Sequence, residues 1–173
     1  GSVEGWEQMV RDRITGPLGM SDTVVRPSEA QRERLAQGLS DGHRAPIWPI
    51  YAWAAAGALR STSHDMVSFL AANLGKGDAP ADLIAAMALT HEARYRLETP
   101  GKPEFQALTW RVEKTSSEGE RIVYKDGGTA GFSSFAGFNP DKELGVVLLA
   151  NWRGAPVVRI GREVIGYIDN GER

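Results

Sequence analysis

The sequence predicts an α+β protein in which an antiparallel sheet is flanked by helices. Apolar residues between Gln106 and Asn151 recur with a period close to two, which is typical of strands. Two turn-forming segments, Ser116–Gly119 and Asn139–Asp141, interrupt this region and favour hairpins, which join antiparallel neighbours. Helical periodicity precedes the strands and returns after them. The expected strands are Gln106–Glu113, Arg121–Lys125, Ser133–Asn139 and Gly145–Asn151.

Four segments are expected to be helices. Each has apolar residues at three- and four-residue spacing, and most have a start or stop signal, such as the stop at Gly16-Pro17 or at Gly75. Side-chain caps and prolines mark the starts. The expected helices are Val3–Ile14, a segment from Thr62 or Ser63 to about Leu74, a segment that follows Pro80, and Val157–Ile168.

Two segments between the first two helices are expected to be loops. Residues 26–44 are polar and rich in turn-forming residues. Residues 45–58 differ, because they place Trp48, Tyr51 and Trp53 among alanines and prolines. These large aromatic side chains either fill a gap in the core or line a pocket, and the sequence leaves both readings open.

Composition excludes several functional classes. The chain has 173 residues, of which 42% are hydrophobic and 24% charged, as in ordinary globular domains. A net charge of -2 gives no reason to expect binding to nucleic acid, which normally needs a basic face. No apolar run reaches the roughly 18 residues of a membrane span. With no cysteine, and with His43, His64 and His91 outside any metal-ligand spacing, we expect no metal and no cofactor.

The glycine-rich run from Tyr124 to Phe132, which reads YKDGGTAGF, is the most informative stretch of the chain. Its lysine precedes two glycines, which have no Cβ and so allow main-chain N–H groups to approach a substrate carbonyl. A glycine-rich hairpin or bulge is the alternative interpretation. The context of the run helps to decide between them.

That context resembles the C-terminal part of the serine β-lactamase and penicillin-binding-protein superfamily, with class C β-lactamases and their esterase and peptidase relatives as the best match. The run is followed by an aromatic segment, an Asn-Pro-Asp turn and an apolar segment that ends in Leu-Ala-Asn. Upstream, PLGM and Thr23 resemble the family segment PLGM-x-x-T, and residues 56–66 (AGALRSTSHDM) resemble a second one. Leu-Thr-Trp stands where relatives have Gly-Leu-Gly-Trp. In order, these four matches are residues 124–151, 14–23, 56–66 and 108–110.

Two family motifs are missing from the sequence. None of the lysines has a serine three residues before it, so the nucleophile motif Ser-x-x-Lys is absent. No tyrosine begins a Tyr-x-Asn motif, and there is no Gly-x-Ser-x-Gly elbow. The resemblance therefore implies an incomplete β-lactamase/transpeptidase-like domain: residues 3–173 would be its C-terminal half, mainly helices and loops to residue 105 and then strands and a final helix. Gly1-Ser2 has the form of a scar from tag cleavage.

The resemblance also implies a role for individual residues. In these enzymes a serine attacks a lactam, ester or amide, and an acyl-enzyme forms and is hydrolysed. Lys125 stands at the place of the lysine in the family's Lys-Thr-Gly box, Asp126 replaces its threonine, and Gly127 is its glycine. Gly128 would donate a backbone N–H to the oxyanion, so Lys125 and Gly128 are the candidate catalytic residues. The candidate substrate-binding residues are Asp126, Gly127, Thr129, Tyr51 and Gly57, with Arg60 and Arg153 as further anion contacts.

Asp126 is the main departure from the family pattern. A carboxylate there would repel the acid group of a penicillin or neutralise Lys125, which favours an ester or peptide substrate. Alternatively, Asp126 only satisfies backbone groups of a turn.

Two functional classes remain open from the sequence: a part of a serine hydrolase that is inactive by itself, and a non-catalytic domain that binds a ligand or partner. The expected partners are a small-molecule substrate in the complete enzyme and either the missing N-terminal half or a second copy of the chain, through an exposed apolar face. The resemblance suggests a periplasmic or secreted location.

Overall fold

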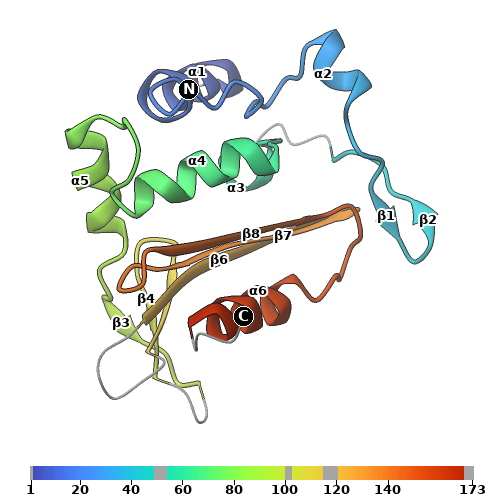
Figure 1. Cartoon of the computed structure of the whole chain (residues 1–173). Helices are drawn as coiled ribbons and strands as arrows, with labels where there is room; N and C mark the ends of the chain where they lie inside the picture. Colours follow the sequence, from blue (N-terminus) through green and yellow to red (C-terminus); the bar gives the residue numbers. More distant parts are fainter. Residues whose placement is uncertain (1, 49–53, 100–102, 115–120, 170–173) are drawn as a thin grey trace.

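The computed structural model describes residues 2–48, 54–99, 103–114 and 121–169, and it confirms the predicted α+β class. Its main sheet has the strand order β3-β4-β5-β6-β7-β8, and every neighbouring pair is antiparallel. Helix α4 covers one face of this sheet and α6 covers the other, while α1 lies outside α4 (Figure 1). The strands are β3 (Tyr95–Arg96), β4 (Glu104–Gln106), β5 (Arg111–Lys114), β6 (Arg121–Thr129), β7 (Phe132–Asn139) and β8 (Leu144–Ala150).

The helices follow the local signals of the sequence. Helix α1 (Val3–Val10) continues as the π-helix η1 (Arg11–Thr15), and together they cover the predicted first helix. The Thr62 hydroxyl accepts a hydrogen bond from the Asp65 N–H at 3.2 Å and so caps α4 (Ser63–Asn73). Gly75 follows with a φ of 68°, a conformation that favours glycine at the end of a helix. The other helices are α2 (Glu29–Glu33), α3 (Ala54–Gly57), α5 (Ala81–Thr90) and α6 (Val157–Asp169).

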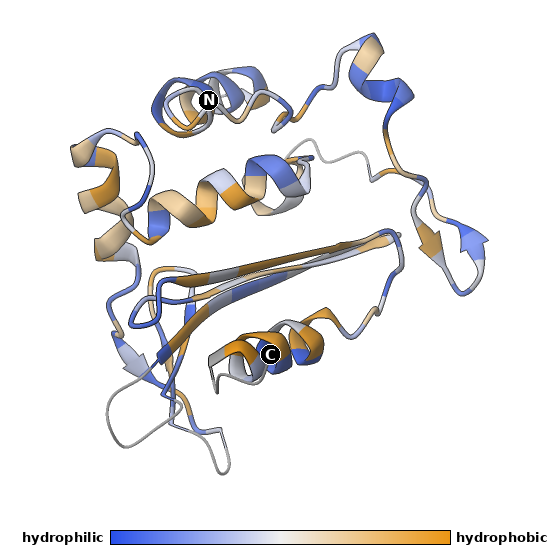
Figure 2. Ribbon diagram, viewed as in Figure 1, coloured by the Kyte–Doolittle hydropathy of each residue, from blue (hydrophilic) through white to orange (hydrophobic). Residues whose placement is uncertain are grey.

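Two apolar clusters hold the layers together. The first lies between α4 and the sheet and includes Leu70, Trp110 and Phe138. The second lies between the sheet and α6 and includes Phe135 and Ile165. Hydrophobic colour is concentrated on α5, α6 and β8, whereas α2 is mostly hydrophilic (Figure 2). Burial on both faces explains why adjacent residues of the central strands are apolar.

The expectation of a loop over residues 26–44 was wrong in part. Ser28 and Gln31 form a reciprocal capping box at the start of the short helix α2 (Glu29–Glu33). A small hairpin follows, with strands β1 (Leu39–Ser40) and β2 (His43–Arg44). Its turn residues, Asp41 and Gly42, have φ values of 52° and 78°, as a two-residue hairpin turn requires. The capping-box residues Ser28 and Gln31 and the turn pair Asp41-Gly42 are both visible in the sequence.

The prediction of one strand from Gln106 to Glu113 was also wrong. The chain folds back within it, because the Ala107 N–H donates to the Trp110 carbonyl at 2.9 Å and Thr109 adopts a φ of 71°. Strands β4 and β5 are therefore the two arms of a hairpin. The alternating pattern of side chains continues on both sides of the turn, so periodicity alone did not reveal it.

The glycine-rich run is mostly strand rather than turn. Strand β6 extends four residues beyond its predicted end at Lys125, through both glycines to Thr129. Only Ala130 and Gly131 form the turn to β7. Of the two other predicted turns, the one at Asn139–Asp141 is confirmed, since residues 140–143 connect β7 to β8 as a hairpin. The other, Ser116–Gly119, lies outside the described residues.

Candidate active site on strand β6

The side chains of β6 alternate between the two faces of the sheet. Val123 belongs to the cluster under α4, and Tyr124 belongs to the cluster under α6. By the two-residue period of a strand, Lys125 and Gly127 project to the α4 face and Asp126 to the α6 face. Consecutive residues of the glycine-rich run therefore face opposite sides of the sheet.

One edge of β6 is open beyond Tyr124. Strand β5 pairs with β6 only up to the Arg111–Tyr124 pair, whereas β7 pairs with β6 through Thr129. In the described part of the chain, residues 125–129 are therefore bonded to a strand on one side only. Residues 125–128 are exposed. A strand edge of this kind presents N–H and C=O groups to a ligand.

The ladder fixes which backbone groups face that edge. The Lys114 N–H donates to the Pro103 carbonyl at 3.1 Å, so the backbone groups of Lys114 point away from β6. Because backbone groups alternate in direction along a strand, the backbone groups of Arg111 point towards β6. Tyr124 is the partner of Arg111 in register, and its backbone groups point back towards β5. Continuing the alternation, Asp126 and Gly128 direct their N–H and C=O groups to the open edge.

The Lys125 ammonium lies at the same edge. It hydrogen-bonds the Asp126 carbonyl oxygen and lies 3.2 Å from Asp126 Oδ1. Both side chains are half exposed, so water screens this ion pair. The predicted catalytic residues Lys125 and Gly128 are thus brought to one edge, with Asp126 between them in the chain.

The turn after this segment is held from outside the sheet. The Leu39 N–H donates to the Gly131 carbonyl at 3.1 Å and to the Asn151 carbonyl at 2.9 Å. The Asn151 side-chain amide donates to the Gln37 carbonyl at 3.0 Å. Asn151 is the last residue of the Leu-Ala-Asn segment. It therefore holds the loop before β1 in place, and Leu39 of that region in turn holds the turn of the glycine-rich hairpin at Gly131.

The other predicted site residues are only partly gathered here. A Cβ on Gly57 would lie 3.9 Å from the Thr129 methyl group, so the end of α3 approaches the end of β6. Arg60 donates to the Val25 carbonyl at 2.5 Å and supports a loop. Arg153 is exposed, and its N–H donates to the Leu39 carbonyl at 2.8 Å.

The aromatic residues of the predicted loop give a mixed outcome. Tyr51 and Trp53 lie outside the described residues. Trp48 is 51% exposed and does not fill the core.

Of the histidines, His64 is exposed, while His91 is buried and its Nε2 lies 2.7 Å from Asn73 Oδ1.

Sequence reasoning missed a polar network on the α6 face. The Tyr124 hydroxyl donates to Glu104 Oε1 at 2.6 Å, and Arg111 lies 3.3 Å from Glu104 Oε2. Burial by itself would raise the pKa of Glu104, but the hydrogen bonds from Tyr124 and Thr99 and the nearby arginines outweigh it and lower the pKa. Burial and the Glu104 carboxylate raise the pKa of Tyr124. No local sequence signal joins residues that are 20 positions apart.

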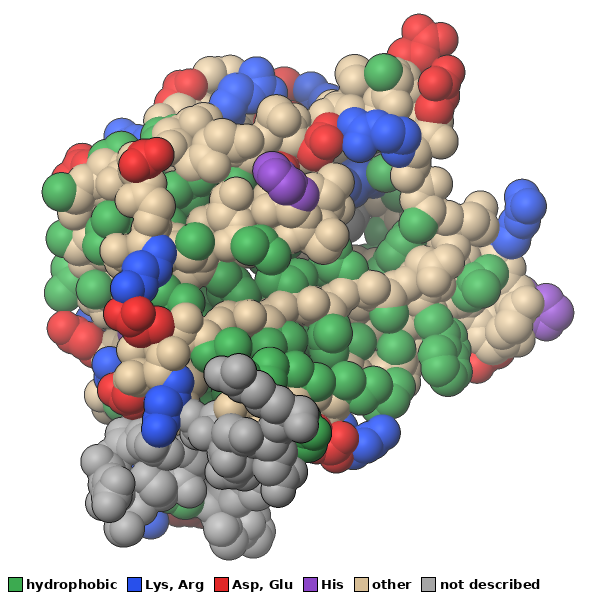
Figure 3. Space-filling model, viewed as in Figure 1, with side chains coloured by type: hydrophobic (Ala, Val, Ile, Leu, Met, Phe, Trp, Pro, Cys, Tyr) green, Lys and Arg blue, Asp and Glu red, His purple; other side chains and the backbone are tan. Residues whose placement is uncertain are grey.

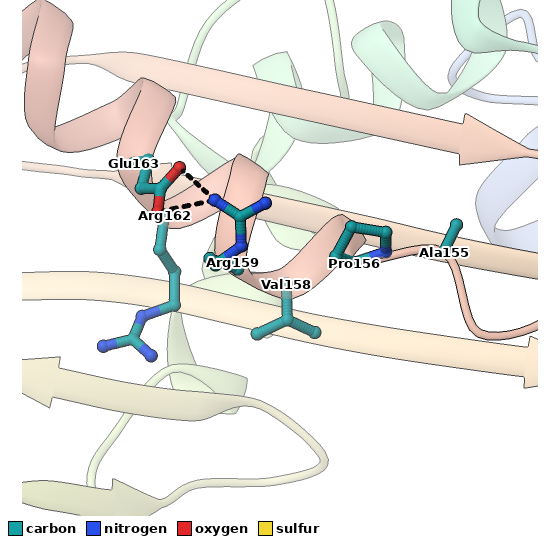
Figure 4. A pocket seen from close by; sticks show the side chains of 6 residues that line it. All are labelled: Ala155, Pro156, Val158, Arg159, Arg162 and Glu163. Carbon is teal, nitrogen blue, oxygen red and sulfur yellow. Dashed lines mark hydrogen bonds and ion pairs between the residues drawn. The ribbon is translucent and has the colours of Figure 1, made fainter.

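Helix α6 completes this network. Figure 4 shows Arg159 and Glu163 paired on the helix, with Arg162 extending from it towards the strands. Arg162 donates to Glu113 Oε1 at 2.5 Å. A separate cavity of about 290 Å³ is lined by residues that include Glu104, Arg111, Glu113, Tyr124, Asp126 and Arg162. The described residues contain no group of three His, Cys, Asp or Glu side chains placed to bind a metal ion, and no helix among them is long and apolar enough to cross a membrane.

The chain is similar to known proteins in sequence and in fold. The family model for β-lactamase matches residues 1–167. The chain is 30% identical over 152 residues to the human "Putative beta-lactamase-like 1", covering 83% of this chain and 29% of that protein. It is 28% identical over 157 residues to the "D-alanyl-D-alanine-carboxypeptidase/endopeptidase AmpH" of Escherichia coli K12, covering 86% of this chain and 40% of that protein.

Solved structures share the fold. A class C β-lactamase from Rhodobacter sphaeroides superposes with a TM-score of 0.81 at 22% identity, covering 94% of this chain and 54% of that one. The chain thus spans about half, or less, of the length of the proteins it matches. The matched family model, the relatives and the shared fold show that this chain belongs to the β-lactamase family.

Proposed function

We propose that this chain is the C-terminal part of a β-lactamase-family serine hydrolase and supplies part of its acylation site. Gly128 would donate its backbone N–H to the oxyanion, and Lys125 would place a positive charge beside it. The observation that carries this proposal is the open edge of β6, where the Gly128 backbone groups and the Lys125 ammonium occur together. The nucleophile would come from a Ser-x-x-Lys segment outside this chain.

The substrate is proposed to be a neutral ester or amide, or a peptide without an acid group at this position. Asp126 lies 3.2 Å from the Lys125 ammonium and offsets its charge. The cavity on the Asp126 side of the strand contains two further carboxylates, Glu104 and Glu113, against two arginines. A carboxylate-bearing lactam would therefore meet a weaker attraction than Lys125 alone would provide.

The proposed partner of this chain is the N-terminal half of the same domain. In the part of the chain that the structure describes, β8 ends the sheet order and pairs only with β7. Apolar side chains gather between the strands and α6 in the face shown in Figure 3. Helix α6 also has exposed apolar residues, among them Ile160 and Ile168, which are 37% and 49% exposed. A free strand edge beside an apolar patch fits a further strand and helix better than it fits water.

The decisive experiment uses the complete protein and this chain side by side. Each is incubated with a fluorophosphonate and with a fluorescent penicillin, and covalent labelling is measured by intact mass. We expect one label on the complete protein and none on this chain, because no serine here is followed three residues later by lysine. Labelling of neither protein would favour the alternative, a non-catalytic domain that binds a ligand or partner.

The partner proposal has its own measurement. Sedimentation of this chain, alone and mixed with the separately produced N-terminal half, should show a stoichiometric complex in the mixture. Self-association without capture of the other half would assign the patch to a second copy of the chain. A monodisperse monomer in both samples would refute an exposed docking face.

A further inference from the structure

The open segment of β6 begins at a residue that is fixed by its side chain. Tyr124 is the last residue of β6 with a partner on β5, and only 6% of its surface is exposed. Its hydroxyl donates to Glu104 Oε1 at 2.6 Å, and Thr99 donates to the other oxygen of the same carboxylate at 2.8 Å. Glu104 is itself 8% exposed. Hydrogen bonds to a buried carboxylate are among the stronger ones in proteins.

Further contacts hold the Tyr124 ring in place. The ring of Phe135, from β7, stacks on it with centroids 5.8 Å apart and an angle of 24°. The Arg162 guanidinium, from α6, lies 5.8 Å from the ring centroid while it binds Glu113 of β5. Side chains from β4, β7 and α6 therefore meet at this one residue of β6, and a side chain from β5 holds the α6 arginine in turn.

The next five residues have much less support. Residues 125–129 are bonded to β7 alone and include two glycines, which gain little from side-chain packing. The far end of the segment is fastened where Leu39 binds the Gly131 carbonyl. The direction of the Gly128 N–H consequently depends on two anchors, one at Tyr124 and one at Gly131.

We propose that Tyr124 and Glu104 are positioning residues for the open edge of β6. Their buried hydrogen bond sets the start of the segment, so that Gly128 keeps its backbone N–H at the edge and Lys125 stays beside it. Neither residue contacts the substrate in this arrangement, because both side chains lie on the opposite face from Lys125. The catalytic part of this inference rests on the proposed hydrolase function, whereas the structural part does not.

The test compares Tyr124→Phe with Tyr167→Phe in the complete protein. Both substitutions remove one hydroxyl, and Tyr167 is 53% exposed on α6, away from the network. Backbone hydrogen exchange is followed by mass spectrometry on a peptide that covers residues 125–131. We expect exchange in Tyr124→Phe to become about 10- to 100-fold faster, the range for a lost hydrogen bond to a charged group, and Tyr167→Phe to match the parent.

A second variant separates positioning from general stability. Glu104→Gln weakens the same contact from the other side, so the double variant should exchange no faster at residues 125–131 than the more affected single variant. If Tyr124→Phe does not fold, hydrogen exchange at residues 125–131 is compared between Glu104→Gln and a control, Glu92→Gln, at an exposed carboxylate. Unchanged exchange at residues 125–131 in both single variants would overturn the proposal, as would additive effects in the double variant.

Activity gives a separate readout. In the complete enzyme, Tyr124→Phe should lower kcat for ester hydrolysis about tenfold or more and leave KM within about twofold, because substrate contacts remain while the oxyanion donor is less well placed. A change confined to KM would contradict a positioning role. If the parent protein hydrolyses nothing, the proposed function fails, and hydrogen exchange still decides whether the two residues fix the strand.

Discussion

Gly38 and Gly131 meet backbone to backbone at the end of the candidate site. A Cβ placed on Gly131 would lie 2.7 Å from the Cα of Gly38 and 2.7 Å from the Cβ of Ala45. Neither neighbour can move without moving the main chain, so this contact excludes every side chain at Gly131. The glycine-rich hairpin and the loop before β1 are thereby held in a single arrangement.

The first prediction concerns that contact. Gly131→Ala should destabilise the chain by about 1–3 kcal/mol, because it forces the two backbones apart and disturbs the Leu39–Gly131 hydrogen bond. Gly166→Ala is the matched control, because its added Cβ would meet no atom of the described residues within 4 Å apart from the neighbouring backbone of its own helix. Alanine in a helix should stabilise by about 0.5–1 kcal/mol. Urea unfolding measures both, and equal midpoints for the two variants would contradict the packing argument.

The second prediction concerns Lys125. In the complete enzyme, Lys125→Ala should reduce the acylation rate by about tenfold or more, since it removes the positive charge beside the proposed oxyanion donor. Stability should change by less than about 1 kcal/mol, because the side chain is half exposed. Lys76→Ala removes an exposed ion pair with Glu143 and should leave acylation unchanged. Acylation rates are measured by stopped flow. If Lys125→Ala acylates as fast as the parent enzyme, the lysine is not part of the site.

The third prediction concerns the charge of Asp126. Asp126→Thr removes the carboxylate 3.2 Å from the Lys125 ammonium and restores the hydroxyl of the family pattern. Turnover of carboxylate-bearing β-lactams should rise more than turnover of neutral esters. The gain should shrink as salt is added, because exposed charges are screened. An equal gain for both substrate types at all salt concentrations would mean that the charge is not the cause.

The fourth prediction concerns the pH dependence of stability. Burial, and secondly the charge of Arg121, lower the pKa of His91 to about 4 in the folded chain. The unfolded chain therefore binds the proton first as the pH falls from about 6.5, the ordinary histidine value, towards 4. Stability should decrease through this window by up to about 1.4 kcal/mol per pH unit and level off below it as far as this residue is concerned.

Substitution separates His91 from the carboxylates that titrate at lower pH. Urea unfolding at pH 7, 6 and 5 should give a smaller loss of stability for His91→Gln than for the parent. His64→Gln is the control, because the His64 side chain is 89% exposed. Identical pH slopes for His91→Gln and the parent would show that His91 is not the group responsible.

The sequence by itself determined the parts of the fold that depend on neighbours in the chain. The Thr62 cap, Gly75 and the apolar stripe predicted α4, and the pattern of Val157–Ile168 predicted α6, because caps and helical faces are set within one or two turns. The alternating segments predicted an antiparallel sheet. The ordered motifs around residues 14–23, 56–66 and 124–151 identified the family.

Only the tertiary structure decided where strands begin and end and which residues meet between them. A reversal at Thr109 and the extension of β6 to Thr129 both depend on which partner strand is available, and periodicity does not record that. The open edge beyond Tyr124 exists because β5 begins only at Arg111, the partner of Tyr124 in register, and so has no residue to pair with residues 125–129. The Tyr124–Glu104 hydrogen bond depends on the register across three strands, which fixes contacts between residues distant in sequence that no local pattern of residues specifies.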